Sequence, residues 1–525
     1  MSLYPASDLP TFCDVLVCGG GINGCGIARD LAGRGLKVVL CEQDDLAAHT
    51  SSASTKLIHG GLRYLEYFEF ALVHKALAER EVLLKSAPHI MWPMRFVMPH
   101  HVGMRPLWMI RTGLFIYDHM ARRKMLPASR AVDLRRHLAG NPLKPLYTKG
   151  FEYSDGWVDD ARLVVLNAVD AAERGATIVT RTRCTQASRK ASGWQVRLQR
   201  GNGTPHVLGA HALVNATGPW AGQFLREQIA LPSAKSLRLV KGSHIVVAKL
   251  FDHNHAYIFQ NPDQRIVFAI PYEGEFTLIG TTEVEHHGEA GTVSIDATET
   301  AYLCEQVSRY FARPVSPADV VWSYSGVRPL IDDEAASATA VTRDYSLELN
   351  AEGAPLLTAW GGKLTTYRKL AEQAADVLCS QGPFNGRDRK AWTQGALLPG
   401  GDLGDWLANR GQLGDADALE QPETAFARFV KTFASVYPRL PTALVYRLAR
   451  CYGTRAELVL SAGTLGTEIA PAVYEAELNY LRQHEWACTA EDVLWRRTKL
   501  GLHLNAEQRA QVQAWWSATD QRSQA

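Results

Sequence analysis

The sequence lacks the features that mark membrane-spanning and secreted proteins. None of its apolar runs reaches about 18 residues, the length that a helix needs to cross a bilayer. Its start, MSLYPASDLPTFCDVLVCGGG, has no basic stretch followed by an apolar core, so we expect no secretory signal. Both absences predict a cytoplasmic protein that does not cross a membrane.

Cysteine pairs and a strong net charge are also missing. The nine cysteines are scattered and form no C-x-x-C pair, so we predict neither a metal site nor a disulfide framework. Lys and Arg number 56 against 54 Asp and Glu, a formal charge of +2. This balance does not favour nucleic acid as a partner, and any basic site has to be local.

One stretch departs from this balance. Between Arg95 and Arg136 lie nine Lys or Arg and two Asp, interleaved with large apolar residues such as Trp108 and Phe115. Such a mixture suits a segment that lies on an anionic membrane surface. A solvated basic face over a buried apolar strip explains it equally well.

The strongest local pattern is a glycine turn near the N-terminus. Gly19, Gly21 and Gly24 fit G-x-G-x-x-G between an apolar strand and a helix. In such turns the glycines allow a tight bend, close approach of a pyrophosphate and close packing of helix and strand. Glu42 ends the next strand, where a carboxylate can accept a hydrogen bond from a ribose hydroxyl. We predict a dinucleotide site, and the acidic residue disfavours NADP.

A second glycine turn, TAWGGKLTTYRKLAEQ, invites comparison with a triphosphate-binding P-loop. That motif needs a glycine where this chain has Leu357, and Ser or Thr where it has Leu364. The turn still opens a helix, whose free N–H groups suit an electron-rich partner. Together with the N-terminal turn and the strand ALVNATGPWAG, it resembles the FAD fold of glutathione-reductase type.

The rest of the chain divides into strands followed by helices. Short β-branched runs dominate the middle, Gly and Pro gather around residues 379–405, and a helical pattern follows. Thr489 with Asp492, and Asn505 with Gln508, resemble helix-capping pairs. We predict an oxidoreductase region at 12–385, a linker at 386–398 and an α-helical domain at 399–525. Within the first region the FAD-binding segments are about 12–75, 150–225 and 320–380, and the substrate-domain segments about 76–149 and 226–319.

Several motifs, among them SSASTKLIHGGLRYLE, VNATGPW, KGSHIVV, IGTTEVE, WSYSGVRPL and WGGKLTTYRKLAE, closely resemble aerobic FAD-dependent glycerol-3-phosphate dehydrogenases. The resemblance implies a Rossmann-like, D-amino-acid-oxidase-like α/β fold with an antiparallel-sheet substrate domain and a helical C-terminal domain. It implies oxidation of sn-glycerol 3-phosphate to dihydroxyacetone phosphate, with electrons passed to a membrane quinone. It also implies a homodimer on the cytoplasmic face of the inner membrane. The calcium-binding EF-hand of the mitochondrial members is not visible.

The same resemblance implies residue roles. For the substrate they are Arg63, Tyr64, Thr281, Arg343 and Lys363, with His244 and Arg328 as catalytic residues. For FAD they are Gly19, Gly21, Ile22, Asn23, Gly24, Glu42, Ser51, Ser52, Ser54, Lys56, Gly60, Gly61, Leu62, Ala216, Thr217, Gly218, Gly361, Gly362, Leu364 and Thr365.

The chemistry of these residue types leaves alternatives open. Arg and Lys suit a phosphate group, although any one Arg is also a common surface ion-pair partner, and Tyr64 can simply pack. His244 is a candidate base, or else a structural hydrogen-bonding residue, in which case Arg328 stabilises the developing alkoxide. Two rival functions are an amino-acid or sarcosine oxidase, which binds a carboxylate, and a non-catalytic redox sensor.

Overall fold

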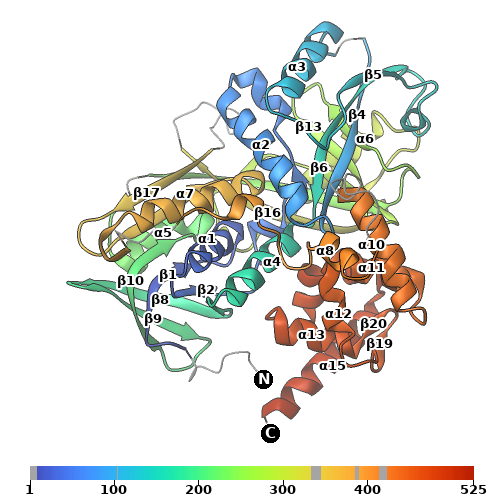
Figure 1. The fold of residues 1–525 in the computed structure, drawn as a ribbon. Helices are drawn as coiled ribbons and strands as arrows, with labels where there is room; N and C mark the ends of the chain where they lie inside the picture. The colour runs from blue at the N-terminus through green and yellow to red at the C-terminus, as the bar shows by residue number, and fades with distance from the viewer. Residues whose placement is uncertain are drawn as a thin grey trace.

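The computed structural model describes residues 9–102, 104–233, 235–332, 344–384, 390–412 and 422–524. Within them the chain forms two large β-sheets with covering helices, followed by a helical C-terminal region (Figure 1). The first sheet carries the glycine turns, and the second sheet lies beside it. This is the α/β architecture expected from the sequence.

The first sheet has eight strands, with β1 and β10 at its centre. β1 pairs in parallel with β2 and β10, and β10 in parallel with β18, while β17, β9 and β8 are added antiparallel. Central strands covered on both faces read as continuous apolar runs, as β1 does. The strands are β1 (Phe12–Cys18), β2 (Val38–Cys41), β7 (Thr177–Val179), β8 (Thr182–Lys190), β9 (Gly193–Arg200), β10 (His206–Asn215), β17 (Tyr345–Asn350) and β18 (Leu356–Gly361).

Three helices cover one face of this sheet and form its main core. They are α1 (Ile22–Gly33), α4 (Asp160–Glu173) and α7 (Tyr367–Cys379), and α1 packs on both of the others. Almost every residue of α4 is buried, because the helix lies between α1 and the C-terminal region. A short helix, α5 (Ala221–Phe224), follows β10 on the other face.

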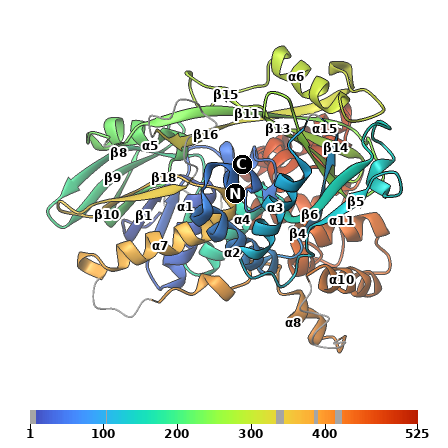
Figure 2. The ribbon, with the colours of Figure 1, turned by 90° about the horizontal axis from the view of Figure 1, so that it is seen from above.

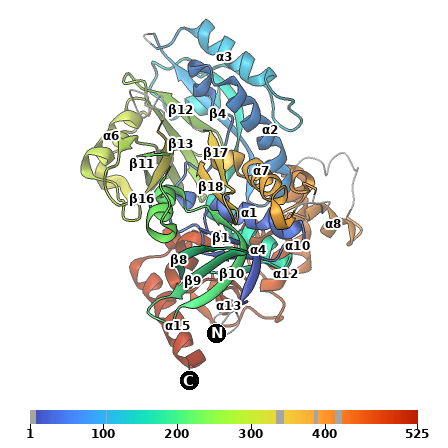
Figure 3. The ribbon, with the colours of Figure 1, turned by 90° about the vertical axis from the view of Figure 1, so that its left-hand side faces the viewer.

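The second sheet has ten mostly antiparallel strands, and β11 and β16 are its longest, side by side (Figure 3). Helices α2 (Phe70–Ser86) and α3 (Leu107–His119) cover one face, and α6 (Ala297–Ser308) covers the other (Figure 2). The strands are β3 (Leu57–Ile58), β4 (Met91–His100), β5 (Arg130–Asp133), β6 (Lys149–Val158), β11 (Leu237–Ala248), β12 (Ala256–Gln260), β13 (Ile266–Tyr272), β14 (Phe276–Gly280), β15 (Val284–Glu285) and β16 (Val320–Ile331).

The C-terminal region has its own apolar core, made only of residues after position 399. Both expected capping pairs are present: Asp492 and Thr489 exchange hydrogen bonds of 3.0 and 3.1 Å, and Asn505 and Gln508 exchange two of 2.9 Å. The elements are α8 (Leu403–Ala408), α10 (Pro422–Val436), α11 (Thr442–Tyr452), α12 (Ala456–Val459), α13 (Glu475–His484), the π-helix η12 (Asp492–Arg497), α14 (Leu500–His503), α15 (Ala506–Gln524) and the hairpin β19 (Glu468–Ala470) with β20 (Val473–Tyr474).

Strand pairing divides the oxidoreductase region differently from the segments drawn on the sequence. β3, β6 and β16 lie in the segments assigned to FAD binding, yet they pair in the second sheet. β12 and β4 run parallel in that otherwise antiparallel sheet. Strand partners are set by distant residues, which local composition does not reveal. Among the described residues, no helix is both long and apolar enough to span a bilayer.

Candidate active site

The N-terminal glycine turn packs so closely that side chains would not fit. Gly19 has a φ of 112°, and a Cβ there would lie 2.5 Å from the carbonyl oxygen of Ala216. A Cβ on Gly24 would lie 1.9 Å from the carbonyl oxygen of Gly19. Because glycine alone permits these contacts, the turn brings β1, α1 and the end of β10 together at one point.

Glu42 reaches back to this turn from the end of β2. One carboxylate oxygen accepts a hydrogen bond of 2.6 Å from the Gly20 amide, and the other accepts one of 2.8 Å from Asp44. Burial raises the pKa of Glu42, and the two backbone hydrogen bonds oppose that rise. The carboxylate therefore also fixes the turn, a role beyond the ribose contact expected from the sequence.

The second glycine turn contacts the first. Gly361 and Gly362 have φ angles of 66° and 102°, and the Gly361 carbonyl accepts a hydrogen bond of 3.1 Å from the Asn23 amide. Asn23 and Gly361 are 338 positions apart in the chain. Lys363 follows, and the short helix η8 (Leu364–Thr366) leads into α7.

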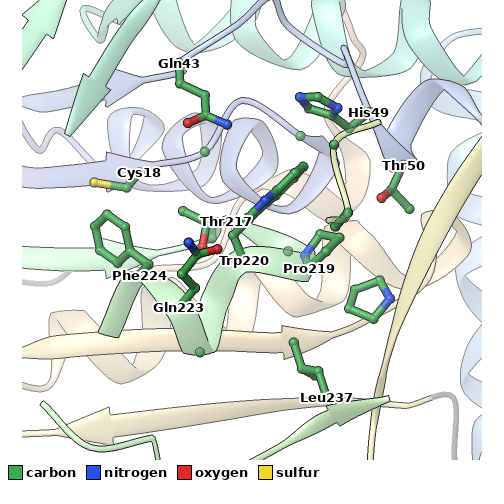
Figure 4. A pocket seen from close by; sticks show the side chains of 18 of the residues that line it. Cys18, Gln43, His49, Thr50, Thr217, Pro219, Trp220, Gln223, Phe224 and Leu237 are labelled. Atoms are coloured by element: carbon green, nitrogen blue, oxygen red, sulfur yellow. The ribbon is translucent and has the colours of Figure 1, made fainter. Parts of the chain in front are cut away.

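A cavity of 1490 Å³ opens along the carboxyl ends of the first sheet's strands (Figure 4). Ligands of open α/β sheets bind at such edges. Its wall includes His49 and Trp220, whose rings meet edge to face with centroids 4.8 Å apart. The predicted cofactor residues that line it are Gly19, Gly21, Ile22, Asn23, Glu42, Ser51, Ala216, Thr217, Gly218, Gly361 and Gly362.

A second cavity, of 290 Å³, lies between the two sheets. It shares Ile22, Ser51 and Gly362 with the larger cavity, so the two adjoin. The predicted residues that line it are Ile22, Ser51, Ser54, Gly61, Leu62, Arg63, Tyr64, His244, Thr281, Arg328, Gly362, Lys363, Leu364 and Thr365.

Four positive side chains from distant segments line this second cavity: Arg63, Arg265, Arg328 and Lys363. Arg328 on β16 donates a hydrogen bond of 2.9 Å to the Thr281 hydroxyl. The Lys363 ammonium lies 3.7 Å from the centroid of the Tyr64 ring. Such a group of partly buried cations suits a dianionic ligand.

Glu283 is a residue of this cavity that the sequence did not single out. Its carboxylate lies 3.3 Å from Arg328 and 3.9 Å from Arg63, and its side chain is only 11% exposed. Its position two residues after Thr281 was the only available signal. The arginines therefore carry a negative partner that the sequence-based site lacked.

His244 lies on β11 and is buried. Its ring stacks on Tyr324 with centroids 4.8 Å apart, and its Nε2 is 3.0 Å from the Thr55 hydroxyl. Its Nδ1 has no hydrogen-bond partner among the described residues. Burial lowers the pKa of His244 well below 6.5, and the nearby positive charges of Arg328 and Lys56 add to the effect. The imidazole is therefore neutral at neutral pH.

Some predicted site residues do not line either cavity. Lys56 is buried and forms an ion pair of 2.6 Å with Asp160. Ser52, Gly24 and Gly60 also lie outside both linings. Arg343 falls outside the described residues.

One cluster outside both cavities has the composition of a metal site. Ligand atoms of His137, Glu152 and His255 lie within 4.8 Å of one another. Glu152 already pairs with Arg95 at 2.8 Å and with Arg130 at 2.6 Å. Burial alone would raise the pKa of Glu152, but these arginines outweigh it and lower the pKa to about 2. Because two fixed positive charges would repel a cation, we interpret the cluster as an ion-pair network.

Comparison with known families decides the identity of the fold. Residues 14–368 match the family model described as FAD dependent oxidoreductase. The chain belongs to this family of FAD-dependent oxidoreductases. Residues 392–516 match the model of the C-terminal domain of alpha-glycerophosphate oxidase.

Individual relatives of this FAD-dependent oxidoreductase match it over nearly its full length. A glycerol-3-phosphate dehydrogenase of Pseudomonas aeruginosa is 50% identical over 97% of this chain and 96% of its own. A D-erythritol 1-phosphate dehydrogenase of Brucella abortus is 49% identical over 97% of this chain and 98% of its own. The solved glycerol-3-phosphate dehydrogenase of Bacillus halodurans, in complex with FAD, has a TM-score of 0.72 and 26% identity, covering 96% and 94%.

FAD is the cofactor of this oxidoreductase, and the residues present fit it. The glycines leave no room for side chains, so backbone N–H groups can approach a pyrophosphate closely. The Asn23 side-chain oxygen in the same cavity is buried and has no hydrogen-bond partner among the described residues. A polar ligand group satisfies such an atom.

Proposed function

We propose that this protein oxidises sn-glycerol 3-phosphate at C2 to dihydroxyacetone phosphate. The observation that carries the proposal is the grouping of Arg63, Arg328 and Lys363 around a cavity that adjoins the FAD-binding cavity. A phosphate dianion matches several fixed cations, whereas a carboxylate often needs only one. The activities for which the relatives are named support the same substrate class.

In this proposal the cations have two roles, binding of the phosphate group and stabilisation of the charge that develops during the reaction. Arg63 and Lys363 bind the phosphate group, together with Arg343 as the family motif predicts. Arg328 is oriented by its hydrogen bond to Thr281 and stabilises the negative charge that develops on the C2 oxygen. Fixed donors of this kind act most strongly in a cavity that excludes water.

The hydroxyl proton must leave as the C2 hydride departs. In the tautomer whose Nε2–H donates to the Thr55 hydroxyl, Nδ1 of neutral His244 is the acceptor for this proton. FAD, when bound, supplies the acceptor for the hydride. Stacking on Tyr324 keeps the imidazole in one orientation, which favours transfer of the proton at a fixed atom.

Bleaching of the flavin absorbance in the absence of oxygen tests this function. We expect glycerol 3-phosphate to bleach the purified holoenzyme and glycine or sarcosine to leave it unchanged. D-erythritol 1-phosphate, the substrate named for the Brucella abortus relative, is tested in the same way. If it bleaches the flavin faster than glycerol 3-phosphate does, it becomes the proposed substrate. Bleaching by amino acids would favour the amino-acid or sarcosine oxidase. Bleaching by none of these compounds would favour the non-catalytic redox sensor.

We further propose that electrons pass to a quinone at the cytoplasmic face of the inner membrane, and that the outer surface of α3 docks there. Phe68, Trp108 and Phe115 are 78%, 70% and 62% exposed, and Arg111 and Arg122 are exposed nearby. Large apolar side chains beside basic ones suit an anionic lipid surface. The six-residue η3 (Leu62–Tyr67) connects this surface with the second cavity, because it contains Arg63 of the cavity lining and ends next to Phe68.

Binding to lipid vesicles tests the docking surface. Trp108→Ser with Phe115→Ser, or Arg111→Gln with Arg122→Gln, should reduce binding of the holoenzyme to vesicles containing anionic lipid. Val321→Ser removes another exposed apolar side chain, 55% exposed, on β16 and serves as the control. Unchanged binding of both double variants would contradict the proposal. Quinone reduction by vesicle-bound protein should fall in parallel with binding.

We also propose a homodimer, which rests on the family resemblance alone. Static light scattering of the purified holoenzyme should give about twice the mass of one chain. A monomeric mass would contradict this proposal without affecting the others.

A further inference from the structure

Residues 42–49 form one wall of the FAD-binding cavity. Most of this segment lines the cavity, but Asp45 and Leu46 do not. The Asp45 side chain points away from the cavity and is only 1% exposed. The segment therefore has a front that faces the cofactor site and a back that is buried in protein.

The C-terminal region holds the back of this wall. Arg497 on η12 forms two parallel hydrogen bonds with the Asp45 carboxylate, at 2.6 and 2.7 Å. Arg496 adds a third bond to Asp45 at 2.6 Å. Arg497 is fully buried and also donates two bonds to the Glu485 carbonyl, at 2.9 and 2.7 Å. The geometry is rigid, because a bidentate guanidinium fixes both position and angle.

A second connection ends on the same wall. Arg181 forms an ion pair of 2.7 Å with Asp492 of η12, and its backbone N–H donates to the Asp44 carbonyl at 2.8 Å. Asp44 in turn holds His49, at 2.9 Å, on the cavity side. Two contacts therefore run from η12 to the wall, and Arg496, which also pairs with Asp492, links them.

We propose that the helical C-terminal region sets the affinity of the FAD site, with Asp45 as the positioning residue through which η12 holds residues 42–49. A wall that is already ordered loses less conformational entropy when the cofactor binds. Without the Asp45 contacts, part of the binding free energy would go into ordering the segment. Because such coupling is reciprocal, bound FAD also stabilises η12.

Two variants and a matched control test the proposal. Asp45→Asn removes the carboxylate charge, and Arg497→Lys keeps the positive charge but loses the bidentate geometry. Arg455→Gln breaks the pair between Arg455 and Glu173, which also joins the C-terminal region to the FAD-binding region; the side chain of Arg455 bonds to Glu173 and Tyr480 and to no residue of the 42–49 wall. FAD affinity is measured by fluorescence titration of FAD-free protein, well below the melting temperature of each variant.

We expect Asp45→Asn to weaken FAD binding about tenfold and Arg497→Lys to weaken it less. Arg455→Gln should weaken FAD binding at most about twofold, even if its melting temperature falls as far as that of Asp45→Asn. Equal losses of affinity in Asp45→Asn and Arg455→Gln would overturn the proposal, since general destabilisation would explain both.

Hydrogen exchange of the unaltered chain decides the question if the variants do not fold. Backbone amides of residues 492–497, which lie outside the cavity lining, should exchange more slowly in the holoenzyme than in the FAD-free protein. Equal exchange rates in the two forms would overturn the proposal.

Discussion

Glu283 is a residue for which we expect opposite effects on substrate binding and on catalysis. Its carboxylate holds Arg328 and Arg63, but it also adds negative charge where a phosphate is proposed to bind. For Glu283→Gln we expect KM for glycerol 3-phosphate to fall about three- to fivefold, as loss of one partly screened charge implies. We expect kcat to fall as well, because Arg328 loses its acidic partner and keeps only part of what orients it.

Steady-state kinetics of this variant measure both effects. Glu285→Gln is the control, because Glu285 lies two residues on, is exposed and pairs with half-buried Arg238; it should change neither constant. A rise in KM for Glu283→Gln would indicate that the carboxylate organises the phosphate site more than it repels the substrate.

His244 gives a prediction about pH. Burial and nearby positive charges hold its pKa well below 6.5 in the folded protein, so the neutral form persists through neutral pH. Its contribution to stability is therefore complete above pH 6.5 and is lost as the pH falls below it. Accordingly, the acid limb of the flavin-reduction rate should lie below pH 6.5 in the unaltered protein.

Replacing His244 by Asn separates its two possible roles. If it accepts the proton, the anaerobic reduction rate falls about 100-fold and the acid limb disappears. Stopped-flow measurements between pH 5 and 9 give both quantities. An unchanged rate and profile would leave His244 with a structural role only.

At the scale of elements, the N-terminal glycine turn holds β1 and α1 close together, and the cofactor site depends on this packing. In Gly24→Ala the new methyl group would lie 1.9 Å from the Gly19 carbonyl oxygen, so β1 and α1 must separate. We expect a loss of about 1–3 kcal/mol in the free energy of unfolding and poor retention of FAD. Gly113→Ala in α3, where a Cβ meets no atom within 4 Å, is the matched control. Urea denaturation and the flavin content after gel filtration measure the two effects.

The sequence was sufficient to predict those parts of the site that depend on residues close together in the chain. The two glycine turns and Glu42 are local patterns, and the described structure brings them to one cavity. Glu283 and Asp45 escaped prediction because their roles come from distant partners; Asp45 and Arg497 are 452 positions apart. Lys56, which the family resemblance assigns to FAD, is buried in an ion pair with Asp160 and lies outside both cavity linings, so its assignment to FAD stays a prediction.

Over the whole molecule, buried ion pairs join the C-terminal region to the FAD-binding region. Arg162 pairs with Glu485, Arg497 with Asp45 and Arg181 with Asp492, while each region keeps its own apolar core. A buried pair costs most when one partner is removed, because the other charge is left without compensation. The attachment of the two regions should therefore respond sharply to single substitutions and to acid.

Asp492 allows the acid response to be predicted. Burial alone would raise its pKa, but Arg497, Arg496 and Arg181 outweigh burial and lower the pKa to about 2. A depressed carboxylate pKa stabilises the fold above the unfolded pKa of about 3.9, and this stabilisation, about 2 kcal/mol, is lost as the pH falls toward 2. Asp492→Asn should therefore lower the urea midpoint at pH 7, and its difference from the unaltered protein should shrink between pH 4 and pH 2.

Asp133→Asn is the control. The pKa of Asp133 is also about 2, but this residue is exposed, and its replacement should change little at any pH because solvent screens its pair with Arg135. A difference for Asp492→Asn that stays constant down to pH 2 would show that its effect comes from packing, not from its charge.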